Sequence, residues 1–182
     1  MNKINSILSL LIVLSISIAC EPNNPFGGPV YDVEGNLAKD KIVIDEFLLT
    51  AQIDSIYRYH DPTGVVVIVQ EEGSEDKPVS GNLIYTNYTG KLLDGSVFDT
   101  SIESVAKEND IFVEGRNYRL FQFTLGSQDA IPGFNYGFRN LKSGSKAVLI
   151  IPSPWGYRDS ETNERIPPNS VLLFEVEFKG ME

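Results

Sequence analysis

The stretch LIYTNYTGKLLDGSVFDT, residues 83–100, decides the fold because it reads as two strands joined by a tight turn. Apolar and polar residues alternate up to the tripeptide YTG at 88–90, and DG at 94–95 is a dipeptide typical of hairpin turns. The chain then returns through VFD at 97–99. The pattern predicts an antiparallel hairpin whose return strand ends on an aromatic residue and a carboxylate.

The segments around this hairpin predict a mainly antiparallel sheet. Residues 65–69 form an unbroken β-branched run, which is typical of a central strand. Further strands are expected at 82–89, 96–99, 119–125, 145–151 and 171–178. The only good helix inside this part is short, near 133–140. The sequence therefore predicts an α+β fold, in which one antiparallel sheet wraps around one short α-helix.

The residues before this sheet divide into two segments. Residues 21–39 are rich in Pro and Gly and poor in aliphatic residues, which predicts a flexible tether. Residues 40–63 form an N-terminal helical segment, because Ile42, Leu49, Ile53 and Ile56 fall on one helical face. We expect this helix to pack on its own domain, residues 64–182; the alternative is a dimerisation helix.

The first twenty residues have the composition of a secretory signal. Lys3 is their only charge, and 4–19 are almost wholly apolar or small, which is short for a membrane span of about 20 residues. The only cysteine, Cys20, follows Ser17-Ile18-Ala19, and this boundary resembles a bacterial lipoprotein signal. We expect residues 1–20 to be the signal peptide and Cys20 to be the lipidation site. Plain secretion is the alternative.

Composition and isolated motifs argue against several other classes of protein. A formal net charge of −10 without a Lys/Arg cluster argues against a nucleic-acid partner. His60 is the only histidine, which argues against a His-dependent triad or a His-rich metal site. Ser143 and Lys146 have the spacing of some acylating enzymes but lie in a KSGS turn. We expect no metal and no cofactor.

Four blocks in a fixed order resemble the FKBP-type peptidyl-prolyl cis-trans isomerases. They are the hairpin at 83–100, FQFTLG at 121–126, IPGF at 131–134 and RIPPNSVLLFEVEF at 165–178. The resemblance runs from about residue 64 to the C-terminus. It implies the α+β fold already expected and the isomerisation of X-Pro bonds.

The resemblance also implies a set of site residues. Those expected to be catalytic are Tyr88, Phe98, Asp99, Phe134 and Tyr157. Those expected to bind substrate are Phe121, Phe123, Ala130, Ile131, Ile166 and Phe174. The family pattern gives Tyr157 a donating hydroxyl and Ile131 a donating backbone N–H. Each aromatic could instead be simple core, and for Phe123 and Phe174 the two interpretations are equally open.

Prolyl isomerisation suits a site made of such residues. The barrier is amide resonance of about 18–20 kcal/mol, and no covalent bond must break. Twisting the amide reduces its polarity, so an apolar, water-poor pocket stabilises the twisted form relative to the planar, hydrated one. Aromatic walls with one or two oriented donors are therefore sufficient for this chemistry.

The family pattern is interrupted by an insertion at 100–118. Long loops are usually functional or disordered, and we expect this one to overhang the site. The family pairs its site aspartate with an arginine, but the insertion prevents its placement here. Arg116 and Arg119 are both candidates.

The sequence as a whole predicts a lipid-anchored isomerase whose domain lies in the periplasm and accelerates proline-limited folding of exported proteins. Expected partners are proline-containing polypeptides and macrolide inhibitors of the family. The overall form is similar to gliding-motility-associated isomerase lipoproteins of the Bacteroidetes. Two alternatives remain: a non-catalytic binding module acting as a chaperone, and a scaffold subunit of an envelope complex.

Overall fold

The computed structural model describes residues 30–74, 76–161 and 164–182. In this part of the chain seven strands form one sheet in the order β1-β2-β6-β7-β3-β4, with β5 paired to β3. Every pairing is antiparallel. The strands have these bounds: β1 Tyr57–His60, β2 Val66–Glu71, β3 Leu83–Leu92, β4 Val97–Thr100, β5 Phe121–Thr124, β6 Lys146–Ile151 and β7 Leu172–Met181.

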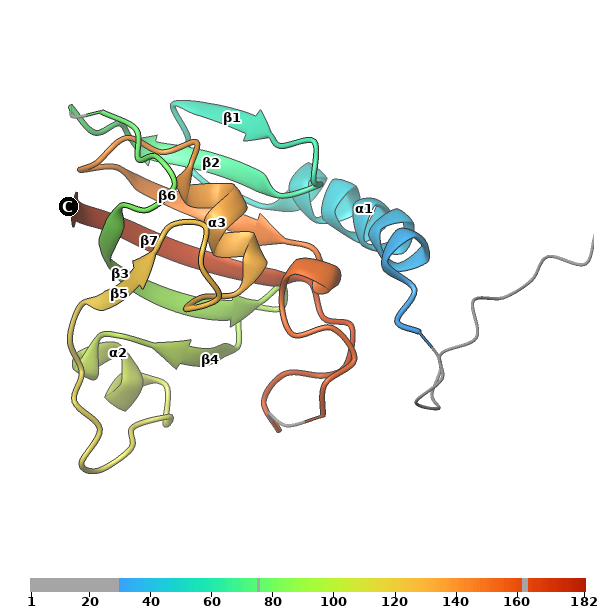
Figure 1. Cartoon of the computed structure of the whole chain (residues 1–182). Coiled ribbons are helices and arrows are strands. Elements are labelled where there is room, and N and C mark those ends of the chain that lie inside the picture. The colour runs from blue at the N-terminus through green and yellow to red at the C-terminus, as the bar shows by residue number, and fades with distance from the viewer. Residues whose placement is uncertain (1–29, 75, 162–163) are drawn as a thin grey trace, which may run out of the picture. The chain divides into compact units, whose positions relative to one another are not determined.

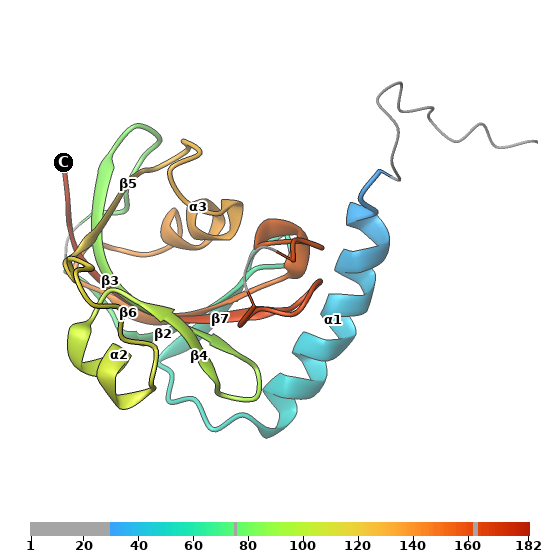
Figure 2. The same ribbon diagram turned by 90° about the horizontal axis from the view of Figure 1, so that it is seen from below.

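Helices lie at both faces of this sheet. The described helices are α1 Val33–Thr50, α2 Glu103–Glu108, α3 Pro132–Phe138 and the 3₁₀ helix η1 Ser153–Trp155. Figures 1 and 2 show the sheet curving around α3, with α1 at the side of the sheet near η1. The predicted α+β fold, an antiparallel sheet around one short helix preceded by an N-terminal helix, is confirmed.

The hairpin β3–β4 has the expected turn. Gly95 has φ +91°, a conformation that side chains disfavour, and the Asp94 carboxylate accepts a 2.9 Å hydrogen bond from the Ser96 backbone N–H. Gly90 is required for close packing, since a Cβ there would lie 2.6 Å from the Phe98 ring. The glycine of the YTG motif thus lets the return strand pack its aromatic residue against β3.

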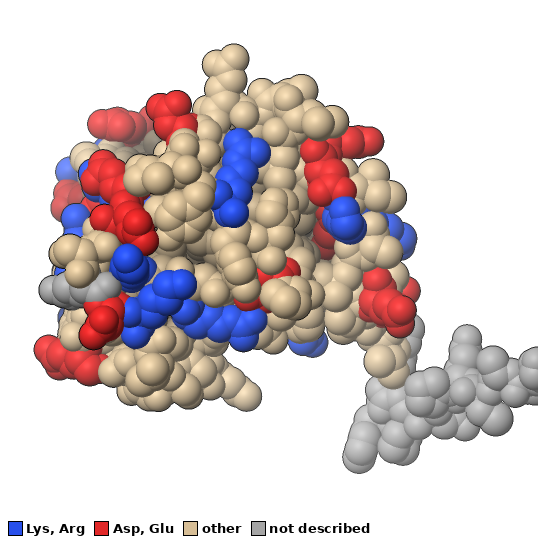
Figure 3. Space-filling model, turned by 90° about the horizontal axis from the view of Figure 1, so that it is seen from above, with Lys and Arg blue, Asp and Glu red and all other residues tan. Residues whose placement is uncertain are grey.

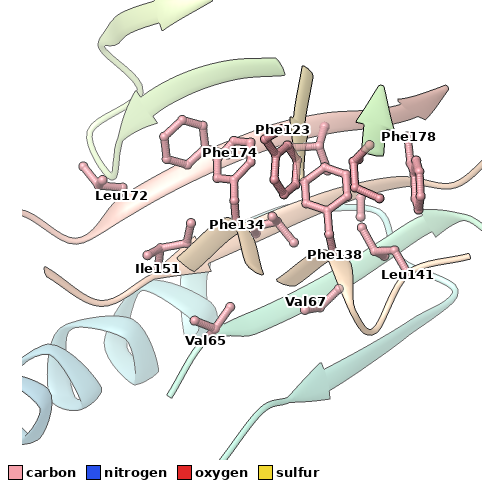
Figure 4. Close-up of a cluster of buried hydrophobic side chains, with 14 of the residues drawn as sticks. Val65, Val67, Phe123, Phe134, Phe138, Leu141, Ile151, Leu172, Phe174 and Phe178 are labelled. Atoms are coloured by element: carbon pink, nitrogen blue, oxygen red, sulfur yellow. The ribbon is translucent and has the colours of Figure 1, made fainter. Parts of the chain in front are cut away.

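The main core fills the space between α3 and the concave face of the sheet. It is rich in aromatic side chains. Five phenylalanines labelled in Figure 4 contact one another here, either edge to face or stacked. Those five rings belong to Phe123, Phe134, Phe138, Phe174 and Phe178. Burying large rings supplies much of the hydrophobic stabilisation of a domain this size. The core therefore also fixes the position of α3.

A second, smaller cluster lies on the other face of the sheet. Alternate residues of β2 and β6, with Leu173 of β7, pack there against Ile44 of α1. Phe47 and Leu48 of the same helix cover the edge of this cluster. Residues 66–69 of β2 alternate between the two clusters, which explains why this part of the strand is apolar at every position.

The helical segment predicted at 40–63 is displaced and rotated in the structure. Helix α1 begins at Val33, where Asp32 caps it by accepting from Gly35 N–H at 2.8 Å, and it ends at Thr50. Ile42 is 61% exposed and Leu49 85%, whereas Asp40 and Ile44 are buried. The prediction was wrong about the face because it assumed that the apolar residues Ile42 and Leu49 must point toward the domain.

Two segment boundaries are corrected by the same observations. Residues 33–39 belong to α1 rather than to a tether, and 21–29 lie outside the described residues, as does Cys20. The sheet starts before residue 64, since β1 pairs with β2 through Tyr57↔Val69. The sequence did not reveal β1 because all four of its residues are exposed and show no alternation.

The insertion is ordered around a short helix. Within 100–118, α2 buries Ala106, and Ile111 is buried just after it. A 2.6 Å ion pair between Glu103 and Lys107 lies along the exposed side of α2. The insertion therefore packs against the domain instead of extending into solvent as a plain loop.

Candidate active site

The sequence-predicted site residues gather at a cavity beside α3. Its volume is about 460 Å³, a size typical of sites that hold small ligands. It lies between the ends of β4 and β5, the segment leading into α3, and the turn after η1. The lining residues are Tyr88, Asp99, Phe121, Gln128, Asp129, Ala130, Ile131, Phe134, Tyr157 and Phe174.

A polar triad occupies one wall of this cavity. The Tyr88 hydroxyl donates to Asp99 Oδ2 at 2.6 Å, and Arg116 Nη1 donates to Asp99 Oδ1 at 2.6 Å. Arg116 Nη2 also donates to the backbone oxygen of Thr100 at 3.0 Å. Both carboxylate oxygens are therefore occupied, and the carboxylate is held in one orientation.

The charge of Asp99 affects the two tyrosines of the cavity. Burial, followed by the hydrogen bond to Asp99 and its negative charge, raises the pKa of the Tyr88 phenol well above its ordinary value. Burial, and after it the Asp99 charge, also raises the pKa of Tyr157. The hydrogen bond to Asp99 is the main cause that raises the pKa of Arg116. Both phenols thus keep their protons at neutral pH and remain hydrogen-bond donors.

Aromatic rings form the apolar walls and floor. The Tyr88 ring meets Phe121 edge to face at 5.6 Å between centroids and meets Phe134 at 6.1 Å. Phe134 is buried at the floor, and Phe174 packs against it at 4.9 Å. These rings in mutual contact give the floor and this wall of the cavity an apolar lining.

Two donors at the cavity have no hydrogen-bond partner among the residues that the structure describes. The Tyr157 side chain is partly exposed, its ring contacts Phe98 at 6.4 Å, and its hydroxyl has no recorded acceptor among the described residues. Ile131 is the residue before α3, and within the described ranges its backbone N–H has no acceptor either. The cavity therefore presents one hydroxyl and one amide N–H that a ligand carbonyl can accept from.

Most of the predicted site residues line the cavity, but three do not. Phe98, Phe123 and Ile166 are buried behind the lining residues. Phe98 supports Tyr157 and Phe174, and Phe123 lies in the core against Phe134 and Phe138. The expectation that Phe98 and Ile166 line the cavity is corrected, and for Phe123 burial supports the core interpretation that the sequence had left equally open. Phe98 and Phe123 support the lining residues from the core.

Sequence reasoning missed two lining residues and left one pairing open. Gln128 and Asp129 line the cavity, and their position just before Ala130 and Ile131 was the only signal for them. Asp129 is fixed by accepting from Thr124 N–H at 3.2 Å. Of the two candidate arginines, Arg116 is the partner of Asp99, whereas Arg119 lines an adjoining cavity of about 350 Å³.

Comparison with known proteins identifies the family. The chain matches the FKBP-type peptidyl-prolyl cis-trans isomerase family over residues 74–179, more than half of its length. The chain belongs to this family. The matched range contains every residue that lines the cavity.

Curated relatives carry the same family name. The chain is 37% identical over 106 residues to FK506-binding protein 1A of Aspergillus fumigatus, covering 58% of this chain and 83% of that protein. It is 35% identical over 106 residues to peptidyl-prolyl cis-trans isomerase FKBP2 of Homo sapiens, covering 58% and 66%. Peptidyl-prolyl cis-trans isomerase FKBP4 of Homo sapiens is 31% identical over 121 residues, but the chain spans only 24% of its length.

A bacterial relative matches beyond the family domain. FKBP-type peptidyl-prolyl cis-trans isomerase FkpA of Escherichia coli is 32% identical over 147 residues, covering 81% of this chain and 47% of that protein. Its crystal structure superimposes with a TM-score of 0.59 at 28% identity, covering 82% of this chain and 62% of that one. This likeness supports the fold described above.

Charges outside the cavity form pairs of opposite sign. On the face in Figure 3, Lys and Arg side chains lie beside Asp and Glu side chains. Lys142 pairs with Glu72 and Lys146 with Glu71, each at 2.9 Å. Among the residues that the structure describes, no group of three or more His, Cys, Asp or Glu side chains gathers as a metal site.

Proposed function

We propose that this chain catalyses cis-trans isomerisation of X-Pro bonds in polypeptides. The observation that carries the proposal is the aromatic cavity whose polar wall is formed by hydrogen-bonded Tyr88 and Asp99, with Arg116 paired to Asp99. Relatives at 35% and 37% identity, named as an isomerase and as an FK506-binding protein, support it.

The cavity has an apolar floor and two hydrogen-bond donors, and each suits one requirement of prolyl isomerisation. The apolar floor at Phe134 receives the proline ring and removes the imide from water, which favours the less polar twisted amide. The donors of Tyr157 and Ile131 hold carbonyl groups of the flanking residues in place. Because the flanking residues are held in place, the X-Pro bond rotates within a bound and oriented peptide and not in a peptide that tumbles freely in solution.

A protease-coupled assay with a proline-containing tetrapeptide tests the proposal. The full-length chain should accelerate isomerisation, which in its uncatalysed form takes tens to hundreds of seconds. FK506 should bind in the same cavity and inhibit. A folded chain that binds FK506 but gives no acceleration would favour the non-catalytic binding module instead.

We further propose that the chain is a lipid-anchored protein of the cell envelope with its domain in the periplasm. The support is the apolar segment 4–19 followed by Cys20. Among the described helices, none is long and apolar enough to cross a bilayer. Cys20→Ser should abolish incorporation of a labelled fatty acid and shift the protein from the membrane fraction to the soluble one. Unchanged labelling and partition would exclude the anchor.

We propose exported, proline-rich envelope proteins as clients, including those used in gliding motility. The proposal rests on the resemblance of the sequence to motility-associated isomerase lipoproteins and on the need of exported chains to complete slow proline steps outside the cytoplasm. Deletion of the gene should slow the maturation of such proteins in pulse-chase experiments. Restoration by wild type, but not by an Asp99→Val variant, would tie the effect to this cavity.

A further inference from the structure

The turn that presents Tyr157 is bound by helix α1 through a buried carboxylate. Asp40 is 6% exposed, and its Oδ2 accepts from both the backbone N–H and the hydroxyl of Ser153, each at 2.7 Å. Ser153 is fully buried and is the first residue of η1. A buried carboxylate is costly unless it is hydrogen-bonded, so this contact specifies where the helix docks.

Ser153 in turn holds the backbone on either side of Tyr157. Its carbonyl oxygen accepts from Gly156 N–H and from Arg158 N–H, each at 3.1 Å. Arg158 has φ +57°, a left-handed conformation that costs roughly 1 kcal/mol or more for a residue other than glycine. The turn therefore depends on hydrogen bonds from its surroundings to keep its shape.

Tyr31, just before the cap of α1, contacts a second segment that packs against the same turn. The Tyr31 hydroxyl donates to Asn169 Oδ1 at 3.0 Å and lies 3.3 Å from Ser153 Oγ. Asn169 N–H donates to the carbonyl oxygen of Arg158 at 2.7 Å, and the Arg158 guanidinium lies over the Tyr31 ring at 5.6 Å. Helix α1 and the residue before its cap thus contact both segments that bracket Tyr157.

We propose that α1 is a positioning element of the active site and that Asp40 is its main positioning residue, acting through Ser153 on Tyr157. The inference rests on the proposed isomerase function and extends it to a helix outside the family match at 74–179. Asp40 does not touch the substrate cavity. It sets the place of the hydroxyl that does.

The chain offers a matched control and an internal probe. Asp45 is on the same helix one turn later, but it is exposed and pairs only with Lys41. Trp155 is the only tryptophan, lies within η1, and donates from Nε1 to the Thr63 carbonyl oxygen at 2.8 Å. Its fluorescence emission therefore reports on the turn itself, independently of catalysis.

The test compares Asp40→Ala with Asp45→Ala in the full-length chain. Asp40→Ala should raise KM for the tetrapeptide about five- to ten-fold with little change in kcat, weaken FK506 binding by a similar factor, and shift Trp155 emission. Asp45→Ala should change none of these. Asp40→Asn keeps an oxygen acceptor for Ser153 and should recover most of the lost affinity.

A double-mutant cycle separates positioning from a general loss of stability. If Asp40 acts through Tyr157, Asp40→Ala should add little to the defect of Tyr157→Phe. Full additivity, or a folded Asp40→Ala chain with wild-type KM, FK506 affinity and emission, would overturn the inference. Should Asp40→Ala not fold, Ser153→Ala removes one of the same hydrogen bonds from the other side and must show the same defect.

Different results would refute the isomerase function and the positioning role of Asp40. A wild-type chain without isomerase activity would refute the proposed function alone. Trp155 emission and FK506 affinity would then still decide whether Asp40 controls the turn.

Discussion

Arg116 and Asp99 join the insertion to the active site through a 2.6 Å ion pair, although 17 residues separate them in the chain. The same guanidinium donates to the Thr100 backbone oxygen at 3.0 Å, so it bridges the end of β4 and the wall of the cavity. The insertion therefore supplies Arg116, which holds Asp99 in place at one wall of the candidate active site.

The first prediction concerns the effect on kcat/KM of substituting the two residues of this ion pair. Asp99→Val removes the acceptor shared by Tyr88 and Arg116 and should lower kcat/KM ten-fold or more, about 1.4 kcal/mol in transition-state stabilisation. Arg116→Ala should lower it less and should add little in the double mutant, because both changes break one network. Arg119→Ala, directly after the insertion and not the partner of Asp99, is the control for tetrapeptide turnover. Wild-type kcat/KM in a folded Asp99→Val chain would refute the assignment.

The second prediction separates a supporting residue from a contacting one. Phe98 is 3% exposed and packs against Phe174 and Gly90, so Phe98→Ala should lower the free energy of unfolding by about 3–4 kcal/mol. Tyr157→Phe deletes only a partly exposed hydroxyl, and it should reduce FK506 affinity with almost no change in unfolding free energy. Denaturant unfolding and ligand titration measure both. Equal stability losses in the two variants would contradict the placement of Phe98 behind the cavity.

The hairpin and the positions of most strands along the chain could be predicted from the sequence because their signals are local. The DG turn at 94–95, the alternation before it and the β-branched run of β2 need no distant partner to be recognised. Most of the cavity followed from the family blocks for the same reason, since Tyr88, Asp99 and Phe134 lie within short motifs.

What could not be predicted depends on partners far away in the chain. Asp40 is buried beside Ser153, 113 residues later in the chain, which donates two hydrogen bonds to it, and helical periodicity gives no sign of such a distant partner. Arg116 could not be distinguished from Arg119 because the choice depends on how α2 folds the insertion back. Ile166 lies within the family block at 165–178, but only packing shows that it is buried in the core and does not line the cavity.

The third prediction concerns pH. The pKa values of Tyr88 and Tyr157 are raised above that of a phenol in the unfolded chain, about 10. Both phenols are protonated in folded and unfolded chains below pH 9, so their full contribution to stability is present there, and activity should not change with their ionisation between pH 7 and 9.

As the pH rises from 10 towards the folded-state pKa, the unfolded chain loses these protons first and the melting temperature should fall. Tyr88→Phe should reduce that alkaline loss. An activity midpoint near pH 10 in a chain that stays folded would contradict the raised values.

The last prediction concerns the surface of the insertion. Val113 is 49% exposed and Leu120 37% exposed, and both apolar side chains lie in the segment that leads from α2 to β5. Leu120 also lines the cavity that adjoins the active site through Tyr88 and Phe121. A tetrapeptide reaches only the active-site cavity, whereas an unfolded protein extends across the neighbouring surface as well.

Val113→Ser combined with Leu120→Ser should therefore leave tetrapeptide turnover within about three-fold but slow the catalysed refolding of a proline-limited protein several-fold. Val79→Ser, another exposed apolar residue on a separate loop, is the matched control and should change neither. Arg116→Ala gives the contrasting case, since it disturbs the catalytic wall and should reduce turnover of both substrates. Equal loss on both substrates in the Val113 and Leu120 variant would mean that this surface shapes the cavity itself, and no loss on either would show that unfolded chains do not use it.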